Sequence, residues 1–366
     1  IGAFGFGSRT AHVYHELSKV NSNCRMVAYV DPMPIGKDYA EKNGFSVERG
    51  VAGMPTAFIA TYGSGRPRIG ILGEFDANAG ISQKQQTTKE ALIEGAPGHG
   101  CGHNLFGTAS LGSAIAIKEL IEKGKIKGTI VFYGTPAEET IFGKVWFARA
   151  GLFNDLDVCM DWHPGTDNEA STQSSKALID FRVKFSGKTA HASADPFNGF
   201  SAVDGMELFT TGINYYREHI KPTARIHYQI EKAGDVVNVV PDKAQIWVRV
   251  RENDRESLNV VYERVKKMAA AGALMAEVEH EIQLISGIYE ILPNRRGAEA
   301  VQANFEMLGP IKYTKSEDRY AKAIQKETGK PEVGMDGGIH PIKDTMPAQG
   351  GSTDVGDVSQ IVPVVR

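Results

Sequence analysis

The chain has 366 residues, of which 42% are hydrophobic and 23% are charged, and these proportions are typical of a globular protein large enough for two domains. Its formal net charge of −3 argues against nucleic acid or an anionic membrane surface as the main partner. Three cysteines are too few for a disulfide framework, and no apolar run is long enough to span a bilayer. A cytoplasmic protein that has no membrane segment is therefore expected.

The first forty residues have the pattern of a βαβ unit. Two strands are predicted at residues 2–6 and 25–30, with a helix at about 11–19 between them. The turn Gly5-x-Gly7-x-x-Thr10 lacks the third glycine of a dinucleotide-binding fingerprint. This start is similar to that of the Gfo/Idh/MocA-type oxidoreductases. It keeps an NAD-type oxidoreductase open as an alternative to a strand–turn–helix that serves only as scaffold.

Two apolar runs follow at residues 55–62 and 69–75. The turn Gly63-Ser-Gly-Arg-Pro67 separates them, and this pattern predicts a hairpin or strand pair. The second run ends in Glu74 and Asp76, so that two carboxylates lie at a strand end. Polar residues 80–97 predict a long loop, and loops of that length within compact domains are often functional.

The loop leads into Gly98-His-Gly-Cys-Gly-His-Asn104, and a helix is predicted next at residues 107–123. Cys101 and His103 lie two residues apart, so both side chains point the same way on an extended segment. A thiolate and an imidazole are borderline-soft ligands that suit zinc or a neighbouring transition metal. The alternative is a glycine-rich turn in which Cys101 is buried and His103 caps the helix.

Two further predicted strands end in polar side chains. The strand at residues 128–133 is followed by Glu138 and Glu139, and the strand at 156–160 is followed by His163. Neighbours in an extended chain point apart. One carboxylate could therefore bind a metal while the other takes a proton from water, as metal-assisted hydrolysis requires. Taken alone, the pair is more typical of a solvated acidic cap of the next helix, and His163 could simply be a packed loop histidine. Ligands in open α/β sheets lie beyond the carboxyl ends of the strands. The fact that several predicted strands end in candidate ligand residues therefore predicts one shared site.

Three strings in this order, Gly-His-Gly-Cys-Gly-His-Asn, Pro-Ala-Glu-Glu and Asp-Trp-His-Pro-Gly, resemble the M20 metallopeptidases and amidohydrolases, most closely the aminobenzoyl-glutamate utilisation protein B group. The resemblance implies an α/β, zinc-peptidase-like catalytic domain that cleaves the amide bond of an N-acyl amino acid. It implies a general base at Glu138 and one or two divalent transition metals per subunit, zinc or manganese. The implied metal ligands are Cys101, His103, Glu139 and His163.

Downstream, the pattern has the strand and helix order of a ferredoxin-like α+β domain. The predicted elements are a strand within residues 172–187, a helix at 201–219, a strand at 244–251, a helix at 255–271 and a strand at 276–285. The resemblance implies that residues 172–289 form a lid and dimerisation domain, inserted between residues 1–171 and 290–366 of the catalytic domain. A homodimer follows from that resemblance.

The resemblance also implies substrate contacts from the lid. His191 and Asn238 would reach the oxygen of the scissile amide, His191 in the partner's site, and Arg251 would hold a substrate carboxylate. Without the resemblance, these residues are more typical of a strand-edge cap, a turn and a surface strand charge. A further metal-ligand histidine of the family cannot be placed before Arg366, and His340 is more typical of a structural residue. A third hypothesis, a non-catalytic metal-bound dimeric binding protein, therefore stays open.

Overall fold

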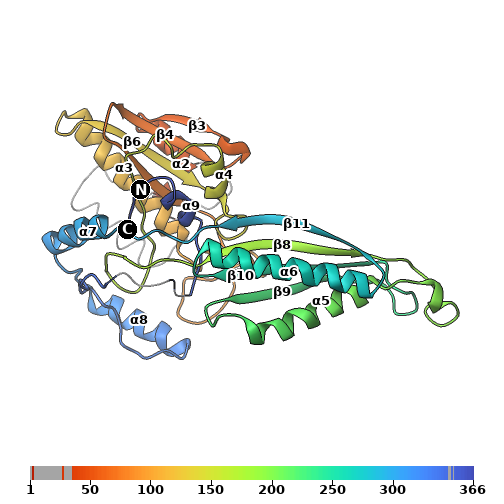
Figure 1. The fold of residues 1–366 in the computed structure, drawn as a ribbon. Coiled ribbons are helices and arrows are strands. Elements are labelled where there is room, and N and C mark those ends of the chain that lie inside the picture. Colours follow the sequence, from red (N-terminus) through yellow and green to blue (C-terminus); the bar gives the residue numbers. More distant parts are fainter. Residues whose placement is uncertain (1, 4–26, 29–34, 345–347, 349) are drawn as a thin grey trace. The chain divides into compact units, whose positions relative to one another are not determined.

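The computed structural model describes residues 2–3, 27–28, 35–344, 348 and 350–366. The chain divides into two compact units (Figure 1). Unit 1 comprises Ile1–Thr172, Leu292–Met346 and Val358–Arg366, and unit 2 comprises Gln173–Ile291 and Pro347–Asp357. Within the described ranges, none of the helices combines the length and the hydropathy that a membrane crossing requires.

Unit 1 is built on a six-stranded sheet in the order β12-β7-β5-β6-β4-β3. Strands β5, β6, β7 and β12 pair in parallel, whereas β4 runs antiparallel to both of its neighbours. All eight positions of β6 are buried, as is usual for a central strand of a parallel sheet. The strands are β3 (Ser46–Arg49), β4 (Phe58–Ser64), β5 (Arg68–Glu74), β6 (Gly128–Thr135), β7 (Val158–Met160) and β12 (Val364–Val365).

Strands β4 and β5 do not form the predicted hairpin. Both strands exist, but β6 lies between them and pairs with each. The prediction of a hairpin or strand pair is therefore wrong, although the turn between the two strands is present. The physical reason is that the most apolar strand takes the centre of the sheet, where both of its faces are covered, and this strand comes later in the chain.

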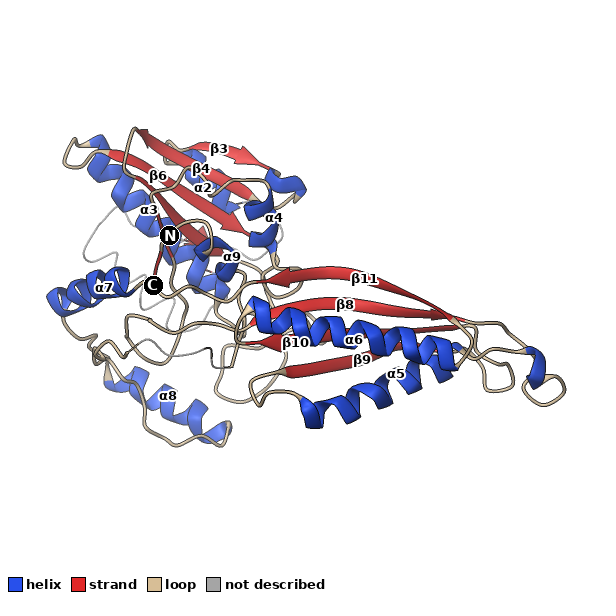
Figure 2. Ribbon diagram, viewed as in Figure 1, coloured by secondary structure: helices blue, strands red, loops and turns tan. Residues whose placement is uncertain are grey.

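In unit 1, α2 packs against β3 and β4, and α3 packs against β5 and β6 (Figure 2). Helix α9 crosses the boundary between the two units. Two short strands near the start, β1 (Gly2–Ala3) and β2 (Val27–Ala28), pair in parallel, which agrees with the predicted βαβ unit at those positions. The helix predicted between them lies outside the described residues. The helices are α2 (Ile35–Lys42), α3 (His103–Glu122), α4 (Gly143–Arg149), α7 (Arg295–Leu308), α8 (Lys315–Glu327) and α9 (Val355–Ser359), with a 3-10 turn η1 (Val51–Gly53).

One glycine sets how closely α3 approaches the sheet. A Cβ placed on Gly107 would lie 2.6 Å from the carbonyl oxygen of Glu74. Only glycine therefore allows the first turns of α3 to pack against the end of β5. Behind this contact, α3 contributes Leu111 to an apolar core that also contains Ile71 and Phe132. The packing fixes the N-terminus of α3 beside the carboxyl end of β5.

Unit 2 has a four-stranded antiparallel sheet in the order β11-β8-β10-β9, with helices α5 and α6 packed on one face (Figure 1). Alternate residues such as Phe181 and Val248 point into the core, where they meet Phe209 of α5 and Val265 of α6. Side chains at Ser201 and Asp254 cap the two helices, as expected for N-cap residues. The elements are β8 (Ala177–Ser186), η2 (Pro196–Asn198), α5 (Ala202–Tyr216), η3 (Arg217–His219), β9 (Arg225–Ala233), β10 (Lys243–Glu252), α6 (Arg255–Met275) and β11 (Glu279–Ile288). The predicted strands and helices are present, and β9, which was not predicted from the sequence, completes the β-α-β-β-α-β order of a ferredoxin-like domain.

Candidate metal centre

The candidate centre lies at the carboxyl ends of three adjacent strands of unit 1. Glu138 and Glu139 follow β6, His163 follows β7, and the N-terminus of α3 supplies Cys101 and His103. The ligand atoms of Cys101, His103 and His163 lie within 4.8 Å of one another, and so do those of His103, Glu138 and Glu139. His103 belongs to both groups, so the structure brings together all five residues of the predicted catalytic and metal-binding set.

A left-handed glycine starts α3 at the centre. Gly102 has φ 81°, and a Cβ there would lie 3.0 Å from the ring of Pro164. The helix begins at the next residue, four positions earlier than predicted, which places His103 in its first turn with 1% of its surface exposed. Across the turn, Cys101 Sγ lies 3.4 Å from His163 Nε2.

Hydrogen bonds decide which ring nitrogen of each histidine faces the centre. His163 Nδ1 lies 2.9 Å from the carbonyl oxygen of Pro164, and because a carbonyl only accepts, this nitrogen donates. His103 Nδ1 lies 3.0 Å from Asp76 Oδ1, which likewise accepts. Both rings therefore present Nε2 to the centre, as metal-bound histidines do when a neighbouring oxygen fixes the tautomer.

The segment after β5 holds the ligand-bearing residues from behind. Asp76 accepts from His103 with one oxygen and from the backbone N–H of Glu139 with the other, at 2.9 Å. The backbone N–H of Cys101 donates to Asn78 Oδ1 at 3.2 Å. Sequence reasoning noted the carboxylate of Asp76 at a strand end but gave it no role. Its two contacts bridge residues far apart in the chain, and no local pattern reveals them.

Glu138 and Glu139 lie in a turn and not in an extended segment. Ala137, directly before them, has a left-handed φ of 64°, and its carbonyl accepts from the N–H of Phe142 at 2.9 Å. Both carboxylates consequently reach the neighbourhood of His103. The two side chains do not point apart as predicted from the sequence, because the backbone is not extended here. Direction alone does not separate a base from a ligand at these two positions.

An aromatic contact fixes the loop of His163 against α3. Trp162 Nε1 donates to Ser110 Oγ at 3.0 Å, and the ring of Phe106 lies 5.6 Å from Trp162 and 6.2 Å from His163. The rings of His103 and His163 meet edge to face at 5.6 Å. These contacts restrict both imidazoles without occupying their Nε2 atoms.

A fully buried ion pair lies beside His103. Lys144 Nζ and Glu74 Oε1 are 2.5 Å apart, and the other oxygen of Glu74 lies 3.0 Å from His103 Nε2. Burial alone would raise the pKa of Glu74, but the charges of Lys144 and His103 hold this pKa at about 2. Sequence reasoning missed Lys144, because a lysine in a short helix is usually a surface charge.

The pKa of His103 is raised even more strongly. Burial would lower this pKa, but interactions with Asp76, Cys101 and the charge of Glu74 raise it to about 12. His103 is therefore protonated at neutral pH unless a cation takes its Nε2. Metal binding at this residue must displace a proton, since only a neutral imidazole is a ligand.

The residues present fit a divalent transition metal. His103 Nε2, Glu74 Oε2 and Glu139 Oε1 are buried and have no hydrogen-bond partner among the described residues. Such atoms carry a free-energy cost, which a bound cation would remove. A thiolate, two imidazoles and carboxylates form a donor set that suits zinc and neighbouring ions.

Unit 2 holds the three predicted substrate-binding residues at two separate ends. An isolated antiparallel bridge between His191 and Val239 places the exposed loops of His191 and Asn238 side by side. Arg251 lies near the end of β10 and donates to Ser352 Oγ at 3.1 Å. Asn238 precedes this ten-residue strand, and at about 3.4 Å per residue the strand separates it from Arg251 by roughly 30 Å. One copy of unit 2 therefore does not bring all three residues together.

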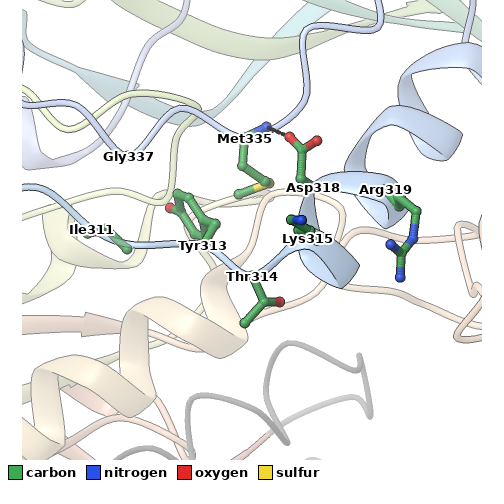
Figure 3. A pocket seen from close by; sticks show the side chains of 8 residues that line it. All are labelled: Ile311, Tyr313, Thr314, Lys315, Asp318, Arg319, Met335 and Gly337. Carbon is green, nitrogen blue, oxygen red and sulfur yellow. Dashed lines mark hydrogen bonds between the residues drawn. The ribbon is translucent and has the colours of Figure 1, made fainter.

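A separate hollow in unit 1, of about 520 Å³, lies around the start of α8 (Figure 3). Asp318 in its wall accepts from the backbone N–H of Met335 at 3.1 Å. None of the residues of the candidate metal centre lines this hollow. Its lining residues are Ile311, Tyr313, Thr314, Lys315, Asp318, Arg319, Met335 and Gly337.

Comparison with known proteins decides the family. Residues 173–275 match the M20 peptidase dimerisation domain. A p-aminobenzoyl-glutamate hydrolase subunit of Escherichia coli (strain K12) is 35% identical over 353 residues, which cover 89% of this chain and 73% of that protein. The chain belongs to the M20 peptidase family. As a member of that family it is a hydrolase.

Other relatives of this M20 chain agree with the assignment. The human Xaa-Arg dipeptidase is 29% identical over 327 residues, which cover 86% of this chain and 65% of that protein. An aminobenzoyl-glutamate utilization protein from Klebsiella pneumoniae has a TM-score of 0.60 at 19% identity, with 90% of this chain and 83% of that chain covered. A Bacillus subtilis protein, described as a dinuclear metal-binding M20 peptidase, has a TM-score of 0.54 at 17% identity, with 90% and 80% covered. The two structures show the fold alone, and this confirms the predicted fold class of the M20 chain.

Proposed function

We propose that this M20 hydrolase is a metal-dependent amidohydrolase that cleaves the amide bond of an N-acyl amino acid of the aminobenzoyl-glutamate kind. The observation that carries the proposal is the convergence of a cysteine, two histidines and two glutamates at the carboxyl ends of adjacent strands. The substrate class is supported by the Escherichia coli relative, which is named as a p-aminobenzoyl-glutamate hydrolase subunit.

In this proposal, one or two divalent transition metals, zinc or manganese, are held by Cys101, His103, Glu139 and His163. When bound, such an ion polarises the substrate carbonyl and lowers the pKa of a water molecule to about 7. Asp76 orients His103 and Glu139 through the two hydrogen bonds of its carboxylate. Glu138, whose carboxylate lies in the same group of atoms, takes the proton of the attacking water and delivers it to the leaving amine.

The lid residues act on the substrate. His191 and Asn238 hydrogen-bond the oxygen of the scissile amide as charge develops on it, and a donor of this kind typically contributes about 3–4 kcal/mol. Arg251 pairs with the carboxylate of the leaving amino acid, in a bidentate geometry that favours arginine.

In this proposal, lid residues from two subunits contribute to each active site. His191 and Asn238 lie at one end of β10, and Arg251 lies at the other. If all three contact one substrate, His191 and Asn238 come from a partner copy. The match of residues 173–275 to a dimerisation domain supports a homodimer through the proposed lid, residues 172–289. Residues 1–171 and 290–366 are proposed as the catalytic domain. Three cysteines in the whole chain, too few for a disulfide framework, support a cytoplasmic location.

The test is a substrate screen on protein purified without chelators. We expect bound zinc or manganese and hydrolysis of p-aminobenzoyl-glutamate or a related N-acyl amino acid, with the free amino acid released. Bound metal without hydrolysis of any N-acyl amino acid would favour the non-catalytic binding protein. Micromolar binding of a reduced nicotinamide dinucleotide, measured by fluorescence titration, would favour the oxidoreductase.

A further inference from the structure

Glu74 has an unusual environment for a carboxylate. It is the last residue of β5, and its side chain is 1% exposed. It lies at the same edge of the sheet as the candidate metal ligands. One oxygen, Oε1, is bound by Lys144 Nζ at 2.5 Å. The other, Oε2, is buried and has no hydrogen-bond partner among the described residues. That free oxygen points toward His103 Nε2, at 3.0 Å.

Three buried polar atoms therefore converge without hydrogen bonds. His103 Nε2 lies 3.0 Å from Glu74 Oε2 and 4.0 Å from Glu139 Oε1. A first-row divalent cation binds nitrogen and oxygen at about 2.0–2.2 Å, so two ligand atoms on one ion lie about 3–4 Å apart. The separations around His103 Nε2 match those of atoms that share one ion.

Lys144 gives a second reason to assign a role to Glu74. A buried ion pair contributes little to stability, because desolvation of both charges offsets their attraction, and apolar replacements are often as stable. The fully buried pair of Lys144 and Glu74 is thus poorly explained by folding alone. Lys144 holds one oxygen of Glu74 and aims the other at the centre. It also balances part of the negative charge that Cys101 and Glu139 bring there as ligands.

We propose that Glu74 is an additional ligand of the metal centre, through Oε2, and that Lys144 is the buried countercharge that positions it. This inference rests on the proposed function, since it concerns the same centre. It adds a carboxylate oxygen to the donor set. Carboxylate oxygen favours manganese more than zinc, which prefers nitrogen and sulfur. Loss of Glu74 should therefore weaken manganese binding more than zinc binding.

The variant must remove the ligand without leaving a lone buried charge. Glu74→Gln alone would remove the charge that faces Lys144, so the test uses the double variant Glu74→Gln/Lys144→Met, which replaces the ion pair by a neutral pair of similar size. Glu252→Gln is the matched control, because Glu252 is a carboxylate 2% exposed in unit 2. Circular dichroism and thermal unfolding of the metal-free proteins show whether each variant folds.

The readouts are chelator-competition affinities for Mn²⁺ and Zn²⁺ and the visible spectrum of the Co²⁺-loaded protein. For the double variant we expect at least about a tenfold loss of Mn²⁺ affinity, a smaller loss for Zn²⁺, and a changed Co²⁺ spectrum, because the coordination number falls. The control should match the wild type. A folded double variant with wild-type affinities and spectrum would overturn the inference and leave the proposed function intact. Weaker affinity with an unchanged spectrum would also overturn it, since Glu74 would then only position His103. A wild type that binds none of the three metals would overturn both proposals.

Discussion

At the level of single residues, the side chains of the centre are held in place by residues that are distant from them in the sequence. Cys101, His103 and Glu139 are positioned by Asp76 and Asn78, which follow a different strand. The geometry does not decide which of Glu138 and Glu139 is the general base and which is the metal ligand. Both carboxylates lie within reach of His103, because the left-handed Ala137 turns the backbone.

The first prediction separates the base from the ligand. Glu138→Gln keeps the size of the side chain and removes the base, so metal content should stay near wild type while kcat falls by at least about a hundredfold. Glu139→Gln should lose metal together with activity, and excess metal should partly restore both. Metal stoichiometry and amide hydrolysis, measured on both variants, check this. A metal-depleted Glu138→Gln beside a metal-replete Glu139→Gln would reverse the two roles.

The sequence predicted the candidate metal-binding side chains of this centre, but it did not predict the residues that support them. Glycine spacing and ligand type pointed to Cys101 and His103, since both features are local. Lys144 and the double contact of Asp76 depend on which strands become neighbours. A buried lysine has the same local pattern as an exposed one, so only the folded structure distinguishes them.

At the scale of elements, the ends of strands and helices decide what the side chains can do. Helix α3 begins at His103 because Gly102 is left-handed, and the sequence-based start at residue 107 missed this turn. Strands β8 and β10 of unit 2 were predictable, since apolar residues alternate along much of each strand, whereas β9 was not predicted. The order of the strands in unit 1 was not, because β6 inserts between β4 and β5 from a later part of the chain.

A second prediction concerns the short helix α9 and pH. Burial raises the pKa of Asp357 to about 7, the backbone N–H of Tyr289 opposes the shift, and Asp354 adds to it. The folded state therefore holds a proton that the unfolded state has lost above about pH 4. The stability from this group is complete below its ordinary pKa and falls as pH rises through about 7.

The corresponding variant is Asp357→Asn, which keeps an acceptor for Tyr289 and carries no charge. Relative to wild type, it should gain stability between pH 5 and pH 8. Thermal unfolding of both proteins across this range gives the difference in Tm as a function of pH. Parallel Tm curves for the two proteins would contradict the raised pKa.

At the scale of the whole molecule, the separation within unit 2 makes the subunit arrangement testable. His191 and Arg251 lie toward opposite ends of the sheet of unit 2. A dimer of one His191→Ala subunit and one Arg251→Ala subunit should then contain one doubly damaged site and one intact site. Two inactive parents should recover activity when they are combined.

The third prediction follows from the number of intact sites in each mixed dimer. Co-expression of His191→Ala and Arg251→Ala chains yields mixed dimers as about half of the total, so activity should reach about a quarter of the wild-type value. Each parent expressed alone should show only residual activity. Recovery is measured on the whole pool of dimers, and mixed dimers isolated through differently tagged chains should reach about half of the wild-type value. Mixed dimers that are as inactive as their parents would show that both residues serve a site from the same subunit.

We propose that metal held at Cys101, His103, Glu139 and His163 is required for amide hydrolysis. The most direct measurement removes the metal with a chelator and then titrates zinc or manganese back, with bound metal and hydrolysis of an N-acyl amino acid followed on one sample. Activity should disappear with the metal and return in proportion to bound ion, up to one or two per subunit. Full hydrolysis by protein that elemental analysis shows to be free of metal would contradict it.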